Sequence, residues 1–284
     1  MLFKLLKYDL RALYKYWWIC AALSLVLSAV GGVSYNILTT RINTLSLTLD
    51  PFMTIAIYIS ALIGVLVSFV GVSAFLFATE LFVFIRFYKH FFSDEGYLTF
   101  TLPVKRSSLL NSKIISAFMI HLSTIAVILV GVCEFVLLGI PMTNLRIMGK
   151  NLYNTYLLLW GNMGDINFAI LVFEIIIASL ILILTTYLFI LISITFGSII
   201  VKKGKVFAAI GIYYLGNSII SGVSQILSTF AYSFLPGILI VMTGYEAGVT
   251  LWMIFLPVIV LLIALTVAMY ALELYMLDRK LNLA

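Results

Sequence analysis

The sequence predicts an all-α, polytopic membrane protein, on the strength of its composition and the length of its apolar stretches. The 284 residues are 64% hydrophobic and only 10% charged, whereas soluble domains carry about 25% charged residues. A bilayer core about 30 Å thick requires about 20 apolar residues per spanning helix. Several stretches reach that length without a central charge. We therefore expect a multi-pass protein of the cell membrane built from helices, which satisfy their own backbone hydrogen bonds in lipid.

Six transmembrane helices are expected from these stretches. They cover approximately residues 17–38, 53–79, 114–140, 168–200, 206–228 and 250–275. The fourth stretch is too long for one perpendicular span, so we expect it to begin outside the membrane or to tilt. No linker or second domain is evident, and residues 1–284 are interpreted as a single membrane domain.

The positions of Lys and Arg orient the predicted spans, because these residues concentrate in cytoplasmic loops. With a cytoplasmic N-terminus, fourteen of the 17 basic residues face the cytoplasm, and only Arg41, Arg146 and Lys150 lie outside. An even number of spans also makes the C-terminus cytoplasmic, which agrees with Arg279 and Lys280. The basic residues flank spans and form no stripe on a soluble domain, so we expect no nucleic-acid partner.

Residues 1–16 are predicted to form an amphipathic helix in the cytoplasmic membrane interface. Basic residues recur on one side, at Lys4, Lys7, Arg11 and Lys15. Leucines recur on the other side, at Leu2, Leu6, Leu10 and Leu13. At about 100° per residue these positions form two separate faces. Such a helix lies in the interface with its basic face toward anionic headgroups or a partner.

Two segments outside the membrane are unusually apolar. Residues 229–249 are interrupted by Pro236-Gly237, which predicts a re-entrant hairpin broken at that dipeptide. The loop at 141–167 contains an apolar patch at 156–160. Because Trp and Tyr favour the membrane interface, we expect this patch to rest on the outer headgroups.

Signatures of catalysis and metal binding are absent from the sequence. Neither Gly149-Lys150 nor Gly204-Lys205 is followed by the Ser or Thr of a phosphate-binding loop, so we expect no ATPase site in this chain. His90 is expected in a cytoplasmic loop and His121 inside the third span, which disfavours a two-His metal or haem site. We therefore expect no enzymatic activity, bound cofactor or metal.

Carboxylates within the spans indicate a possible transport pathway. Glu134 and Glu174 lie in the third and fourth spans, where a charge costs about 3 kcal/mol or more and usually faces a cavity or a partner. Alternatively, these side chains reach the outer interface or remain protonated. Glu80 and Glu273 lie near cytoplasmic ends, and we interpret them as residues that snorkel to the interface.

The fifth span carries a polar stripe. Its members share one helical face and are Asn217, Ser221, Ser224 and Gln225. In lipid such residues turn inward, where they either join helices or line a path for a partly polar solute.

The segment between the second and third spans is the most informative part of the chain. Ser93 is a plausible N-cap, followed by Asp94 and Glu95 in a first turn. Apolar side chains then follow in a loop that should face water, at Tyr97, Leu98, Phe100 and Leu102. An apolar surface held outside the membrane needs a cover, which is either the membrane surface or a soluble subunit.

Several residues of this segment resemble the first cytoplasmic loop of type-2 ABC transporter permeases, and the bacterial Firmicutes-type variant more closely. They are Glu95-Gly96-Tyr97-Leu98, Leu102-Pro103-Val104, Arg106, Leu109-Leu110 and Lys113. Tyr97 stands at the usual Thr, and the stretch from Leu98 to Pro103 is shorter than in the family. The amphipathic N-terminus, six spans and apolar element before the sixth span fit the same family.

The resemblance implies the permease subunit of an ABC exporter, which dimerises with a like or unlike permease chain. A separate ABC ATPase subunit would bind the ATP and dock on the loop. The implied ATPase-coupling residues are Glu95, Gly96, Tyr97, Leu98, Phe100, Leu102, Pro103, Arg106 and Lys113. The possible pathway residues are Glu134, Glu174, Asn217, Ser221 and Gln225. Two other functions stay open: an ATP-independent secondary transporter using Glu134 and Glu174, and a non-transporting membrane scaffold or sensor subunit.

Overall fold

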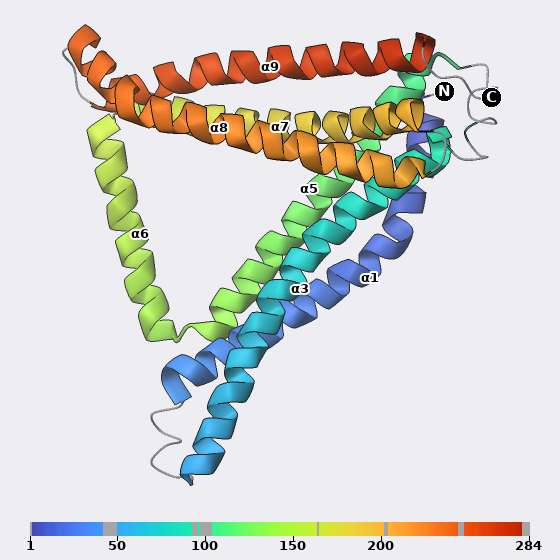
Figure 1. Cartoon of the computed structure of the whole chain (residues 1–284). Coiled ribbons are helices and arrows are strands. Elements are labelled where there is room, and N and C mark those ends of the chain that lie inside the picture. Colours follow the sequence, from blue (N-terminus) through green and yellow to red (C-terminus); the bar gives the residue numbers. More distant parts are fainter. Residues whose placement is uncertain are drawn as a thin grey trace. The chain divides into compact units, whose positions relative to one another are not determined.

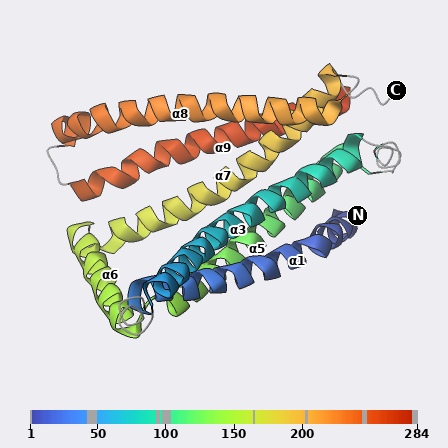
Figure 2. The same cartoon turned by 60° about the horizontal axis from the view of Figure 1, so that its bottom comes forward.

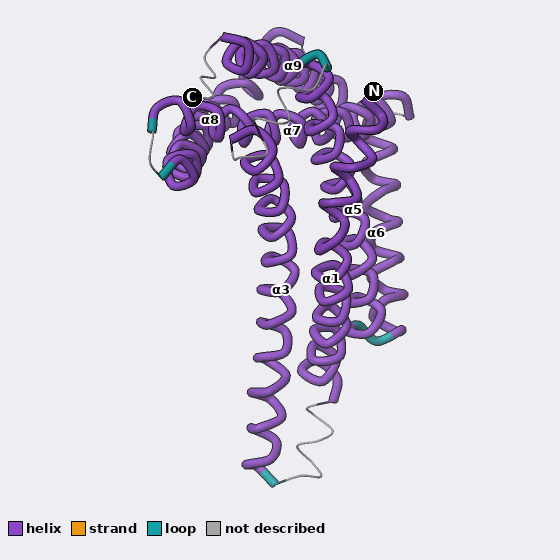
Figure 3. The backbone as a smooth tube through the Cα atoms, turned by 90° about the vertical axis from the view of Figure 1, so that its right-hand side faces the viewer, coloured by secondary structure: helices purple, strands orange, loops and turns teal. Residues whose placement is uncertain are grey.

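The fold is helical throughout the residues that the computed structural model describes, which are 2–41, 50–92, 96, 104–163, 165–201, 204–243 and 247–279. Over these ranges Figure 3 shows helices joined by short loops and no strand. The elements are α1 (Leu2–Asn36), the π-helical turn η1 (Ile37–Arg41), α3 (Pro51–Phe92), α5 (Arg106–Gly139), α6 (Met142–Met163), α7 (Asp165–Ile200), α8 (Lys205–Thr243) and α9 (Ala247–Arg279). The prediction of an all-α fold is therefore confirmed.

Five helical segments among the described residues are long and apolar enough to cross a membrane. They are Phe3–Thr40, Pro51–Phe92, Arg106–Gly139, Val172–Ile200 and Leu256–Asp278. The fourth lies inside the longer helix α7, which begins at Asp165, and the start of this helix outside the membrane stays a prediction. The count of six spans, the cytoplasmic termini and the placement in the cell membrane stay predictions.

The chain divides into two compact units, each with its own packing. The N-terminal unit comprises residues 3–85 and 115–154, and the C-terminal unit comprises 86–114 and 155–284 together with the first two residues. The boundaries fall inside α3, α5 and α6. This division does not test the prediction of one membrane domain.

In the N-terminal unit α1 packs parallel to α5 and antiparallel to α3, and the three helices run together in Figures 1 and 2. The Trp17 indole N–H donates to the Thr124 hydroxyl at 2.8 Å, and the Ser28 hydroxyl donates to the Gly131 carbonyl. A Cβ at Gly32 would lie 2.9 Å from the Phe135 carbonyl oxygen. Small residues thus permit the close backbone approach that holds helices together in lipid.

In the C-terminal unit α7 packs against both α8 and α9. Helix α8 runs antiparallel to α7, and a Cβ at Gly197 would lie 2.7 Å from the Ala209 backbone nitrogen. Helix α9 runs parallel to α7, and the hydroxyls of Thr185 and Thr266 lie 2.8 Å apart. The core side chains of this unit include Tyr187, Leu188, Leu191, Ile194, Leu110 and Leu277.

The helices of the structure differ from the predicted elements at three places. Residues 1–16 form no separate helix, because α1 continues from Leu2 to Asn36. The predicted outer loop at 141–167 is largely the helix α6. The predicted break at Pro236-Gly237 is absent, since α8 continues to Thr243; helices tolerate Pro and Gly in lipid when neighbouring groups satisfy the freed backbone. The interfacial position of residues 1–16 stays a prediction.

Helices cover both ends of the predicted cytoplasmic segment at 84–113, whose position outside the membrane stays a prediction. Helix α3 continues to Phe92 and α5 begins at Arg106, so only residues 93–105 lie between the two helices. At the start of α5 the Lys105 carbonyl accepts hydrogen bonds from the backbone N–H groups of Ser108 (2.9 Å) and Leu109 (3.3 Å).

Candidate coupling site

Most of the predicted coupling residues fall outside the described part of the chain. These are Glu95, Tyr97, Leu98, Phe100, Leu102 and Pro103, and the proposed cap at Ser93. Gly96, Arg106 and Lys113 are described. The structure therefore shows what borders the loop on both sides, and the apolar surface within it stays a prediction.

The end of α3 leads into the loop through buried aromatic side chains. Phe87 and Phe91 are both buried, and the Phe91 and Phe92 rings meet edge to face with centroids 6.3 Å apart. Gly96 is also buried, and a Cβ there would lie 2.6 Å from the Phe91 carbonyl oxygen. This approach is closer than real Cβ atoms tolerate, so the position requires glycine and holds the start of the loop against α3.

Arg106, the first residue of α5, joins the other side of the loop to the end of α9. Its guanidinium donates to the Leu277 carbonyl oxygen and lies 3.3 Å from Asp278 Oδ1. The last four carbonyls of a helix lack partners within the helix, and cations are favoured there by the helix dipole. The Arg106 and Asp278 side chains are 44% and 57% exposed, so their ion pair alone contributes little.

A second hydrogen bond extends this contact further along both helices. The Tyr270 hydroxyl donates to Asn111 Oδ1 at 2.8 Å. Asn111 lies more than one helical turn after Arg106 on α5. Leu109, Leu110 and Leu277 on the same two helices are buried. We call the contacts of Arg106 and Asn111 with Tyr270, Leu277 and Asp278 the α5–α9 anchor.

Lys113, the last of the predicted coupling residues, is only 2% exposed. It lies in the second turn of α5, inside the C-terminal unit. Its burial is consistent with a structural role for this position and provides no surface for a soluble partner.

Glu273 ties α9 to α7 beside the anchor. Its side chain is fully buried, Oε1 accepts a hydrogen bond from the Thr195 hydroxyl at 2.6 Å, and Oε2 has no hydrogen-bond partner. The interpretation of Glu273 as a snorkelling residue is therefore wrong. Proximity to a helix end does not expose this side chain, because α7 covers it. Glu80 is half-buried on α3.

The two carboxylates proposed for a pathway each have one oxygen without a hydrogen bond. Glu174 on α7 is 7% exposed, and Glu134 on α5 is half-buried. In both side chains Oε2 is buried and has no partner among the described residues. Glu134 belongs to the N-terminal unit and Glu174 to the C-terminal unit.

The polar stripe of α8 does not turn inward within the described structure. Asn217, Ser221 and Gln225 are all exposed, and the Ser224 side chain lies outside the described residues. A Cβ at the neighbouring Gly222 would meet nothing within 4 Å. The inward-facing orientation of this stripe therefore stays a prediction.

Sequence reasoning missed the partners that α9 supplies. Tyr270, Glu273 and Leu277 recur at i, i+3 and i+7, so they lie on one face of the helix. Two polar residues at this spacing in an apolar helix are a signal for a buried contact. The sequence does not reveal that Asn111 and Thr195 are the partners.

The chain was compared with protein families, curated proteins and solved structures. No protein-family model, curated protein or solved structure matches this chain. Among the described residues no three His, Cys, Asp or Glu side chains are grouped so that they could hold a metal ion.

Proposed function

We propose that this chain is the membrane-spanning permease subunit of an ABC exporter. In this proposal, a separate ABC ATPase subunit docks on residues 93–105 and supplies the energy by binding and hydrolysing ATP. A second permease chain, like or unlike, completes the pathway, and the chain itself contributes no ATPase site.

The α5–α9 anchor is the observation that carries the proposal. The loop joins α3 tightly at Gly96, where only glycine fits against Phe91. It leads into α5 at Arg106, which contacts the end of α9. Helix α9 is bonded in turn to α7 through Glu273 and Thr195. A displacement of the loop would therefore move α5, and through the contacts of Arg106 and Glu273 it would also move α9 and α7.

Introducing negative charge into the loop tests the proposed docking surface. Aspartate at both Leu98 and Leu102 should abolish ATP hydrolysis that depends on this chain in the purified complex, because a carboxylate has no place in an apolar interface. Insertion into the membrane should persist, since neither residue lies in a span.

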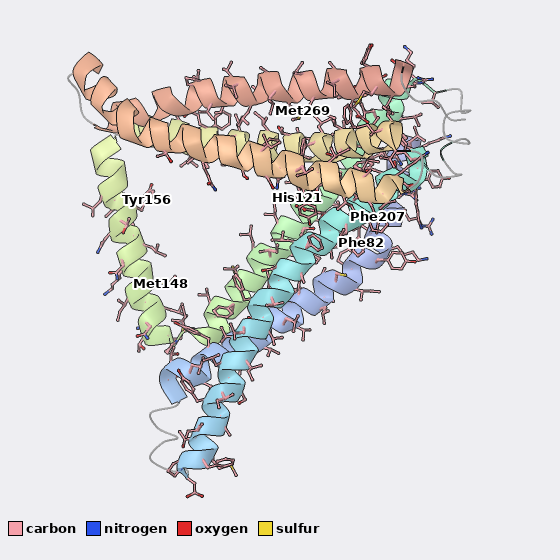
Figure 4. All side chains as sticks on the ribbon, in the orientation of Figure 1. Phe82, His121, Met148, Tyr156, Phe207 and Met269 are labelled. Atoms are coloured by element: carbon pink, nitrogen blue, oxygen red, sulfur yellow. The ribbon has the colours of Figure 1, made fainter. Side chains whose placement is uncertain are left out.

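Phe207→Asp is the matched control. Phe207 is 82% exposed near the start of α8 (Figure 4), at the cytoplasmic end of the predicted fifth span, so the insertion of this variant is verified before its ATP hydrolysis is measured. This variant should hydrolyse ATP normally. Unchanged coupling in the Leu98→Asp/Leu102→Asp variant would reject the proposed docking surface.

A secondary transporter is the competing function, and the unpartnered oxygens of Glu134 and Glu174 favour it. It predicts flux driven by a pH gradient in liposomes that contain this chain alone, and loss of that flux in Glu134→Gln. Absence of any flux without ATP would exclude it. A scaffold or sensor function predicts that cross-linking captures a partner other than an ATPase.

A further inference from the structure

Helix α6 has an exposed surface that the transport proposal leaves unused. From Met142 to Leu158 every side chain is exposed except the half-buried Leu145. Figure 4 shows these side chains along the helix, with Met148 and Tyr156 labelled. Large apolar side chains are among the most open, including Leu152 at 61% and Leu158 at 66%.

Chain connectivity places α6 at a membrane surface. It follows α5 after only two residues and precedes α7 by one. Both neighbours contain candidate spans, whereas α6 contains two basic residues and four Asn among its 22 residues, too many polar groups for a helix that crosses lipid. If α5 and α7 cross the bilayer and α6 does not, both ends of α6 lie at the same membrane face. A helix of 22 residues is about 33 Å long, so it extends along that face.

An apolar stripe and a basic, polar stripe lie on opposite sides of α6, with Ile147 as an apolar residue on the polar side. Apolar residues recur at i, i+3, i+7 and i+11, at Leu145, Met148, Leu152 and Tyr156. Polar residues recur at Thr143, Arg146, Lys150 and Asn154. At about 100° per residue Leu152 and Asn154 point in nearly opposite directions. The residues after Asn154 are apolar on most sides, so the end of α6 that leads into α7 is the more hydrophobic end.

The net positive charge of α6 favours contact with the phosphate groups of anionic lipids. The helix contains Arg146 and Lys150 and no Asp or Glu. Both basic side chains are exposed, and the ion pair described for this chain involves neither of them. Helices with an apolar face and basic residues on the other lie in the headgroup region and bind anionic lipids.

We propose that α6 is an interfacial helix that lies on the phospholipid surface. In this position Leu145, Met148 and Leu152 enter the acyl-chain boundary, and Arg146 and Lys150 contact anionic headgroups. The inference rests on α5 and α7 being spans and is independent of the proposed exporter function.

Fluorescence quenching in proteoliposomes tests the depth of each face. The full chain, with Cys20 and Cys133 replaced by alanine, carries an environment-sensitive label at Leu152→Cys or at Asn154→Cys. In phosphatidylcholine vesicles with added phosphatidylglycerol, lipids brominated on the acyl chains should quench the label at 152 about two-fold more than the label at 154, because only the apolar face enters the boundary. Aqueous iodide should show the reverse order. Met148→Cys supplies the same readout if the Leu152 variant does not insert.

A charge variant tests the headgroup contact. Arg146→Gln with Lys150→Gln should remove the increase in acyl-chain quenching at 152 that phosphatidylglycerol produces over phosphatidylcholine alone. Equal iodide quenching at 152 and 154 would show that α6 stands away from the membrane and would overturn the proposal. A label at 152 shielded from both quenchers would overturn it as well, because protein would then cover this face. An unchanged phosphatidylglycerol effect in the charge variant would reject the basic contact.

Discussion

The hydrogen bond between Thr195 and Glu273 makes a prediction whose size follows from the structure. Both side chains are fully buried, and Thr195 supplies the hydrogen bond of the carboxyl group, at 2.6 Å from Oε1. Thr195→Val keeps the shape of the side chain and removes its hydroxyl. The carboxyl group then lies buried with neither oxygen bonded, because Oε2 already has no hydrogen-bond partner. Leaving a buried polar group without a partner costs about 1–3 kcal/mol.

A double-mutant cycle separates this cost from a packing change. Glu273→Leu removes the polar group, and Thr195→Val with Glu273→Leu replaces both partners by apolar side chains. Such a replacement is nearly neutral when the shapes fit, so Thr195→Val should be much less harmful in the presence of Glu273→Leu. We expect a coupling free energy of about 0.5–3 kcal/mol for residues in direct contact. The assay is reversible unfolding of the purified chain from mild detergent micelles by sodium dodecyl sulfate.

The Thr185 and Thr266 pair is the matched control. It joins the same two helices at 2.8 Å, but its members are neutral hydroxyls, and each has a carbonyl of its own helix as an alternative acceptor. Interhelical hydrogen bonds in membranes contribute about 0.6 kcal/mol on average, so Thr185→Val should cost less than Thr195→Val. Strictly additive effects of Thr195→Val and Glu273→Leu would refute the inference that Glu273 bonds α9 to α7.

Two further predictions concern helix contacts in the C-terminal unit. Gly197→Ala should destabilise the chain by about 1–3 kcal/mol, because the new Cβ would lie 2.7 Å from the Ala209 backbone nitrogen. The control is Gly211→Ala, whose Cβ would meet no atom within 4 Å. This control should be neutral or stabilising in the same unfolding assay. Arg106→Gln should change the free energy of unfolding by less than about 1 kcal/mol, because Arg106 and Asp278 form an exposed ion pair. The same variant should lower the ATP hydrolysis that depends on this chain. Hydrolysis at the wild-type rate would remove the α5–α9 anchor from the proposed coupling route.

The apolar helices could be predicted from the sequence because lipid imposes a length and a composition on every span. Two segments were harder to predict, because their residues have different preferences in water and in a helix bundle. Pro236-Gly237 would end a helix in water, but α8 continues past it. Arg146 and Lys150 lower the hydropathy of 141–167 and favour a loop, although the spacing of Leu145, Met148 and Leu152 already fits the helix α6.

The site itself could be predicted only in part. The motif predicts Arg106 as a coupling residue, but the contact of Arg106 with Leu277 and Asp278 joins residues more than 170 positions apart. The spacing of Tyr270 and Glu273 indicates a buried contact, but it does not reveal that Thr195 on α7 is the partner of Glu273. Exposure of the α8 stripe, at Asn217 for example, is a property of packing and not of helical spacing.

The most direct test of the account is the surroundings of residue 98 in the working protein. A photoreactive cross-linker on Leu98→Cys, in a chain with Cys20 and Cys133 replaced by alanine, is activated in native membranes with and without ATP. The account predicts a cross-link to an ATPase subunit with a phosphate-binding loop, and a yield that changes when ATP is added. A cross-linker that reacts only with lipid, or a chain that transports with no companion subunit, would contradict it.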